Sequence, residues 1–168
     1  MSCEELPLGA PVMSLPPRGL PMRHQLLNDQ NGHRTFAVVL QSGEDAMASL
    51  QDLIRAHKIT AAQLTDIGAF AEVTLGYFDW EKKDYIGNSV REQVEVASMI
   101  GDVALSPSGE AALHVHVVVG KRDGTALAGH LQRGKVRPTL EVILTESPVF
   151  LQKAHDPESG LALIRPKQ

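Results

Sequence analysis

Residues 111–131, AALHVHVVVGKRDGTALAGHL, decide the fold of this chain, and their pattern is typical of a β-hairpin. In the first half, large apolar residues recur at every second position, as they do in a strand with one buried face. These residues are Leu113, Val115, Val117 and Val119. His114 and His116 lie between them and would point to the opposite face. Residues 120–124, GKRDG, form the predicted turn, and residues 125–131 form the second arm, which carries a third histidine.

The three histidines of this hairpin are predicted to share one face. If the hairpin is symmetrical about Arg122, His114 lies directly opposite His130, and His116 follows two residues along. Cβ atoms of cross-strand neighbours are roughly 4.5–5.5 Å apart. Imidazoles at that separation can bind one ion at nitrogen–zinc distances of about 2.0–2.1 Å. A slip of one residue would turn His130 to the other face, and a loop of this length does not fix the register.

Three imidazoles on one face are a candidate metal site. Neutral imidazole binds zinc, iron, nickel or copper, and affinity alone does not choose among them. Three histidines leave a fourth coordination position open, as catalytic zinc sites do, and a metal there could polarise a carbonyl or activate water. The alternative is that the histidines merely decorate an exposed sheet face. The third histidine in cross-strand register favours metal binding.

Composition indicates an ordinary globular chain with an aliphatic core. The chain has 168 residues, 43% hydrophobic and 4% aromatic, a size that buries most of its apolar surface without disulfides. The net charge of −4 argues against a non-specific nucleic-acid binder, which usually carries a basic balance or patch. Cys3 is the single cysteine, the acidic N-terminus is unlike a secretory signal, and no apolar run is long enough for a membrane span. We therefore expect a cytoplasmic protein.

The chain divides into an arm and a domain. Residues 1–22 hold five of the ten prolines and show neither helical nor strand periodicity, so we expect a proline-rich N-terminal arm. Residues 23–168 show no linker and no internal repeat, and we expect them to form a single domain.

One helix and a series of strands are predicted in the domain. The helix begins after Ser42 as N-cap, has acidic residues at 44 and 45 in its first turn, and ends near residues 57–58. Its apolar residues recur at helical spacing and would cover a sheet. The sequence predicts strands over 34–40, 63–70, 72–80, 85–90, 92–100 and 139–145, and a short helical turn over 149–154. This pattern indicates an α+β fold with a largely antiparallel sheet.

Two glutamates and a basic segment are further candidates. Glu95 and Glu141 each lie in an otherwise apolar strand pattern, and a glutamate beside a metal can be a ligand, orient a histidine or shuttle protons. The alternative is a solvent-exposed or interface glutamate, which we favour for Glu141 and weigh equally for Glu95. Basic residues after His130 could hold an anionic substrate, although a solvated loop is the simpler interpretation. These are Arg133, Lys135 and Arg137.

Taken in order, these stretches resemble a known family. They run from the start of the predicted helix, through the strand of Glu95, to the histidine hairpin and the strand after it. They are Gly43-Glu44-Asp45, Ile67-Gly68-Ala69-Phe70, residues 92–96 and 98–102, Leu113-His114-Val115-His116 with Gly120, Ala128-Gly129-His130-Leu131 and residues 137–142. Together they resemble the plants-and-prokaryotes conserved domain, the PPC family, over residues 35–164. Ala128 departs from the second glycine that the family usually has before Gly129.

The resemblance implies a fold, an assembly and a metal. The PPC fold is a largely antiparallel β-sheet flanked by helices, assembled as a homotrimer. The family's characteristic histidines match His114, His116 and His130, which implies a divalent metal, and we expect zinc. Plant members act in chromatin and transcription and contact DNA through an AT-hook, which this sequence lacks. At the level of fold the family is also similar to acetolactate decarboxylase, an enzyme with a three-histidine zinc site, although a shared fold does not imply a shared function.

Two hypotheses for the function follow. The first is a cytoplasmic homotrimer that binds zinc through the three histidines, with the metal as Lewis acid for a small oxygenated or carboxylate-bearing substrate and Glu95 as acid/base. The second is a module that binds DNA or protein to regulate transcription and has structural histidines. The negative net charge and the missing AT-hook count against direct DNA binding, whereas a basic stripe across the trimer would count for it. Its residues would be Lys121, Arg122, Arg133, Lys135 and Arg137.

Overall fold

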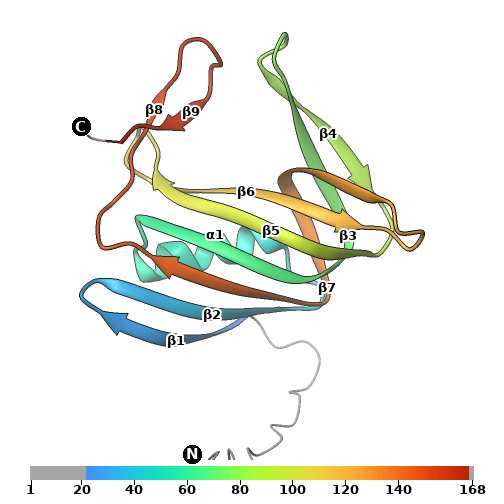
Figure 1. Cartoon of the computed structure of the whole chain (residues 1–168), viewed down its shortest axis with the longest axis horizontal. Coiled ribbons are helices and arrows are strands. Elements are labelled where there is room, and N and C mark those ends of the chain that lie inside the picture. Colours follow the sequence, from blue (N-terminus) through green and yellow to red (C-terminus); the bar gives the residue numbers. More distant parts are fainter. Residues whose placement is uncertain (1–21, 167–168) are drawn as a thin grey trace, which may run out of the picture.

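The computed structural model describes residues 22–166, which form a largely antiparallel sheet with one helix (Figure 1). The elements are β1 (Arg23–Gln30), β2 (His33–Gln41), α1 (Ala46–His57), β3 (Ala61–Asp79), β4 (Asp84–Val90), β5 (Val94–Leu105), β6 (Ala111–Gly120), β7 (Ala126–Glu146), β8 (Lys153–His155) and β9 (Ala162–Ile164). The order in the seven-stranded sheet is β1-β2-β7-β6-β5-β3-β4, and β8 and β9 form a separate pair. The prediction of a largely antiparallel sheet is confirmed, and α1 is the one helix within residues 22–166.

The long strands β3 and β7 hold the sheet together. They pair with each other from Ala62 opposite Glu146 to Gly76 opposite His130. Because β3 also pairs with β5, β5 with β6, and β6 with the first part of β7, these four strands close on themselves. A side chain at Gly68 of β3 would collide with the carbonyl oxygen of Thr139. This glycine therefore permits the close approach of the two strands.

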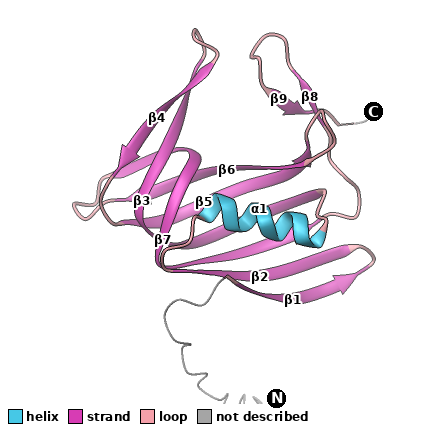
Figure 2. Ribbon diagram, turned by 180° about the vertical axis from the view of Figure 1, so that it is seen from behind, coloured by secondary structure: helices cyan, strands magenta, loops and turns pink. Residues whose placement is uncertain are grey.

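The helix α1 covers one face of the sheet, as predicted, and Figure 2 shows it from that side. Its apolar residues pack into a single, mainly aliphatic core with the inward side chains of the strands. The buried helix residues are Ala46, Leu50, Leu53 and Ile54. The N-cap is Asp45 rather than Ser42, because the Asp45 carboxylate accepts the backbone N–H of Ala48 at 3.0 Å. Glu44 lies before the helix, where its carboxylate accepts the N–H of Gln41 at 2.6 Å.

Three predictions of local structure are wrong for reasons of tertiary structure. The two strands expected over 63–70 and 72–80 are one strand, β3, whose pairing shifts at bulges instead of breaking. The strand expected over 139–145 is the second part of the longer β7. The helical turn expected over 149–154 is extended and leads into β8, because Leu151 accepts the N–H of Leu105 at 2.8 Å and ties the segment to the sheet.

Two predictions concern the chain's ends and its relation to membranes. The proline-rich arm of residues 1–22 lies outside the described residues, apart from Met22. Within residues 22–166, no helix has the length and apolar character that crossing a bilayer requires.

Asp66 is a buried carboxyl group in β3. Its residue is 7% exposed, and neither carboxylate oxygen has a hydrogen-bond partner among the described residues. Burial raises the pKa of Asp66 to about 8. The carboxyl group is therefore mostly protonated in the folded chain at neutral pH, whereas in the unfolded chain it is ionised.

The contribution of Asp66 to the free energy of unfolding should therefore decrease as the pH rises from about 4 to about 8. Over this range the folded state keeps a proton on Asp66 that the unfolded state has released, so rising pH favours unfolding by up to ~1.4 kcal/mol per pH unit. Asp66→Asn removes this contribution, and its stability relative to wild type should rise with pH in urea titrations. The exposed Asp52→Asn is the control and should keep the wild-type slope. Equal slopes for Asp66→Asn and wild type would contradict the assignment.

Candidate metal centre

The β6–β7 hairpin places three histidines on the face of the sheet opposite the core. Alternate residues of β6 are buried, as the sequence predicts; these are Val115, Val117 and Val119. His116, between them, is exposed. In the ladder His116 lies directly opposite His130. The expected pairing of His114 with His130 is therefore wrong by two residues.

The turn explains this difference in register. The loop is centred on Asp123 rather than Arg122, since Gly120 pairs with Ala126. The Asp123 carboxylate accepts the backbone N–H of Thr125 at 2.9 Å and its hydroxyl at 2.6 Å. Gly124 has a φ of +84°, which only glycine adopts easily. A shift of two residues, unlike a shift of one, leaves every histidine on its predicted face.

The three imidazoles converge closely enough to share one ion. One ring nitrogen from each of His114, His116 and His130 lies within 4.8 Å of the other two. The Nε2 atoms of His114 and His116 are 3.2 Å apart. The Nδ1 atom of His130 is buried and has no hydrogen-bond partner among the described residues. A metal ion would satisfy this nitrogen, so the residues present fit a three-histidine site.

The Asp102 carboxylate contacts His114, and the buried Lys153 contacts Asp102 in turn. Asp102 lies opposite His114 in the β5–β6 ladder, and its Oδ2 is 3.1 Å from the His114 Nδ1. Its Oδ1 is 3.2 Å from the Nζ of Lys153, which is 8% exposed. An Nδ1–H donated to a carboxylate fixes the ring and leaves Nε2 free as a metal ligand. Metal-binding histidines commonly donate the N–H of their other ring nitrogen to a carboxylate in this way.

Burial and the neighbouring imidazoles favour the neutral forms of His116 and His130. Burial, followed by the nearby His114 and His116, lowers the pKa of His130 to about 4. Burial and His114 also lower the pKa of His116. Burial by itself would raise the pKa of Asp102, but the hydrogen bond with His114 and the charge of Lys153 outweigh it, and the pKa is lowered. Neutral imidazole is the form that binds a metal.

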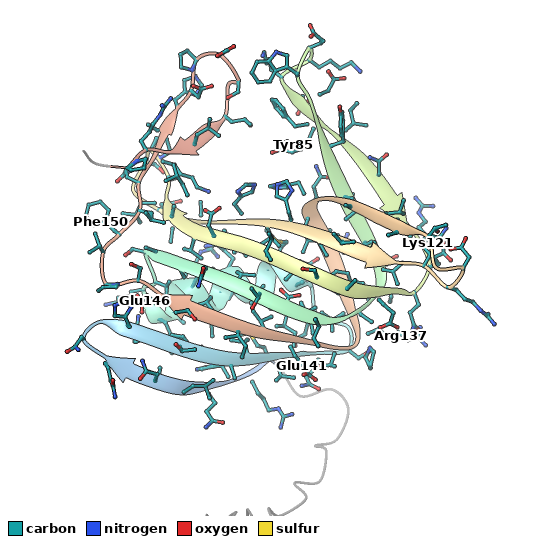
Figure 3. The ribbon with its side chains drawn as sticks, in the orientation of Figure 1. Tyr85, Lys121, Arg137, Glu141, Glu146 and Phe150 are labelled. Carbon is teal, nitrogen blue, oxygen red and sulfur yellow. The ribbon has the colours of Figure 1, made fainter. Side chains whose placement is uncertain are left out.

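The β3–β4 strand pair and the β8–β9 hairpin lie on two sides of the space beside the histidines. His114 and His130 line a pocket of about 420 Å³ together with Asp102 and Lys153. One wall is Tyr85 of β4, whose ring centroid is 4.9 Å from that of His130. The other wall is the β8–β9 hairpin, and Figure 3 shows Tyr85 on the side of the β3–β4 strand pair that faces this hairpin.

The structure does not bring Glu95 to the histidines. Glu95 lies opposite Gly120, whereas Asp102 lies opposite His114, seven residues further along β5 and roughly 20 Å away. Glu95 and Glu141 line a different pocket on the exposed face of the sheet. The acid/base role expected for Glu95 stays a prediction.

Asp102 was missed because the predicted strand ends at residue 100 and because β5 contains a bulge. The β5–β6 register shifts between Val96 and Ser98. In a regular strand Glu95 and Asp102 would face opposite sides, since their positions differ by an odd number. The bulge turns Asp102 to the side of the histidines. Tyr85 and Lys153 carry no local signal, because they are distant in sequence from the hairpin.

The basic residues after His130 are in a strand and not in the expected loop. Exposed basic side chains alternate along β7; they are Arg133, Lys135 and Arg137. Arg133 lies 3.4 Å from the Asp45 carboxylate, and Lys121 lies 2.7 Å from that of Glu92. Figure 3 shows Lys121 and Arg137 toward the same end of the sheet. Acidic partners thus offset part of the proposed basic stripe.

Comparison with known proteins decides the family. The Plants and Prokaryotes Conserved (PCC) domain matches residues 28–148. The chain belongs to this family. This match confirms the resemblance to the plants-and-prokaryotes conserved domain that the sequence shows. A search of curated proteins finds no significant match.

Solved structures share the PCC fold across nearly their whole length. A plant- and prokaryote-conserved protein from Pyrococcus horikoshii is 29% identical, with a TM-score of 0.74 over 80% of this chain and 93% of its own. A metal-containing protein from Archaeoglobus fulgidus is 28% identical, with a TM-score of 0.73 over 88% and 100%. A candidate DNA-binding protein from Ralstonia eutropha is 28% identical, with a TM-score of 0.73 over 79% and 91%.

His130 should stay neutral well below the usual pH range of histidine. In the metal-free protein, its imidazole proton resonances should titrate with a midpoint near pH 4, since burial and two neighbouring imidazoles oppose its protonation. An NMR pH titration, with the resonance assigned through its loss in His130→Gln, measures the midpoint. A midpoint near 6.5, the value of an unperturbed histidine, would contradict the buried environment described here.

Proposed function

We propose that this PCC-domain protein binds a divalent metal ion, zinc, through His114, His116 and His130. The observation that carries the proposal is the convergence of the three ring nitrogens within 4.8 Å. The unpartnered Nδ1 of His130 supports it, as does the Asp102 carboxylate behind His114. The metal-containing relative from Archaeoglobus fulgidus is consistent with the same assignment.

We further propose that the site acts on a small oxygenated substrate. Three histidine ligands leave a coordination position for a substrate or water oxygen, which a bound zinc would polarise as a Lewis acid. The protein's own part is to hold the ligands in place: Asp102 accepts the Nδ1 proton of His114, and Lys153 holds Asp102. Tyr85 packs against His130 and limits access of water from that side.

The proposed assembly is a homotrimer of a single domain over residues 23–168. The exposed face of the sheet carries an apolar patch that a neighbouring copy could cover. Ile100 and Ile143 both lie opposite Thr65, one on each side of β3, and Ile67 follows two residues along. Their exposed fractions are 57%, 45% and 61%. Contiguous apolar exposure of this kind is typical of interaction surfaces.

Removal of one histidine should abolish stable metal binding. Wild-type protein, prepared without a histidine tag and incubated with zinc, should hold about one zinc per chain after gel filtration, measured by elemental analysis. His114→Ala should hold little or none, because two imidazoles remain. His33→Ala, at the exposed histidine that begins β2, is the matched control and should bind zinc as wild type does. Wild type without stoichiometric zinc would end the proposal.

DNA binding is a second candidate function. The relative from Ralstonia eutropha and the exposed basic residues along β7 favour it. Binding through phosphates would weaken steeply with salt, by about 10³–10⁵ between 50 and 200 mM if six to ten phosphates were contacted. Fluorescence anisotropy with a labelled duplex tests this, with Arg133→Gln expected to weaken binding. Absence of binding at low salt would remove this candidate.

A further inference from the structure

We propose that the pocket lined by His114 and His130 binds a small amphiphilic anion, namely a carboxylate or related oxyanion on an aliphatic chain. This inference rests on the proposed metal, which would bind the anionic head. It goes beyond that proposal because the charge and the apolar wall of the pocket indicate which class of ligand would bind beside the metal.

The charges of the pocket and of a bound metal favour a ligand with an anionic head group. Asp102 and Lys153 are the two oppositely charged side chains among the described residues that line the pocket, and they pair at 3.2 Å. Their charges therefore largely cancel. Imidazole ligands bind a metal in their neutral form and bring no negative charge. A divalent ion at this site would thus remain uncompensated until an anionic ligand binds in the open position.

The rest of the pocket calls for an apolar tail. Beyond the polar residues around the histidines, the lining consists mainly of aliphatic side chains. These are Leu113 and Ala112 of β6 and Leu161, Ala162, Leu163 and Ile164 of the C-terminal segment. Leu163 is 41% exposed although it lies beside a polar site. A tail against this wall would remove its apolar surface from water, and a pocket of about 420 Å³ has room for one.

The apolar wall is a fixed part of the fold. The β8–β9 hairpin is tied to the end of β5, because the Gln152 side chain donates to the carbonyl of Ser106 at 2.9 Å. The Arg165 N–H donates to the carbonyl of Gln152 at 2.9 Å and closes the hairpin at its base. At the tip, Asp156 accepts the hydroxyl of Ser159 at 2.7 Å. The hairpin therefore holds its leucines in place before a ligand arrives, which lowers the entropic cost of binding.

This segment lies beyond the part of the chain that matches the family. The PCC domain matches residues 28–148, and β8 and β9 begin at Lys153 and Ala162. The tail of the ligand would then contact this C-terminal segment, and its head would lie beside His114 and His130.

The test uses alkyl hydroxamates, which combine a metal-binding oxyanion with a tail of chosen length. Full-length protein is loaded with zinc, its zinc content is measured, and binding is followed by calorimetry from acetohydroxamate to octanohydroxamate. The association constant should rise about 4-fold for each added methylene and then level off when the pocket is full. Alkylamines of the same lengths should not bind.

A matched pair of variants locates the tail. Leu163→Ser should lower the affinity for the longer hydroxamates by about 10-fold or more and leave acetohydroxamate binding and zinc content unchanged. Leu127→Ser is the control, because Leu127 is also a strand leucine, 38% exposed, and does not line the pocket. It should behave as wild type.

The outcomes separate this inference from the proposed function. A zinc-loaded protein whose affinity does not change with tail length, or a Leu163→Ser variant with the wild-type series, would overturn the inference and leave the metal site intact. Equal binding of alkylamines would overturn the anionic head. Wild type that holds no zinc would overturn both.

Discussion

The antiparallel pairing of β6 between β5 and β7 is the constraint on which the rest of the structure depends. It buries one set of side chains of β6 in the core and leaves His114 and His116 on the other face. The same two ladders bring Asp102 opposite His114 and His130 opposite His116. Core and candidate site are thus two faces of one strand, and a change in register would alter both. Burial of the aliphatic face stabilises this register and so indirectly orders the imidazoles.

Segments that are distant in sequence from the β6–β7 hairpin complete the pocket beside the histidines. β4 contributes Tyr85, which packs against His130, and β8 contributes Lys153, which pairs with Asp102. Lys153 stabilises the ionised form of the half-buried Asp102 carboxylate by its opposite charge, and the same ion pair connects β8 to β5. The C-terminal hairpin is therefore joined to the site through a chain of contacts from Lys153 to Asp102 to His114.

The two carboxylates of β5 show why the sequence predicts part of the site and misses the rest. Glu95 lies within the strand predicted over residues 92–100, whereas Asp102 follows the predicted end of that strand. Regular alternation would place them on opposite faces, but the shift between Val96 and Ser98 changes the face of everything that follows. A bulge depends on how the partner strand pairs, and the sequence of β5 alone contains no reliable sign of it. The expected glutamate therefore lies opposite Gly120, and the aspartate contacts the histidine.

The sequence by itself determined the elements that depend on local periodicity. Alternation along residues 111–120 placed His114 and His116 on one face, and helical spacing placed α1 over the sheet, because these patterns reflect which side chains must leave water. Tertiary structure alone decided the register, the bulge in β5 and the enclosure of the site by Tyr85 and Lys153. These features arise from hydrogen bonds and contacts between residues distant in the chain, such as Lys153 with Asp102. Periodicity within one segment contains no information about which distant segment will pack against it.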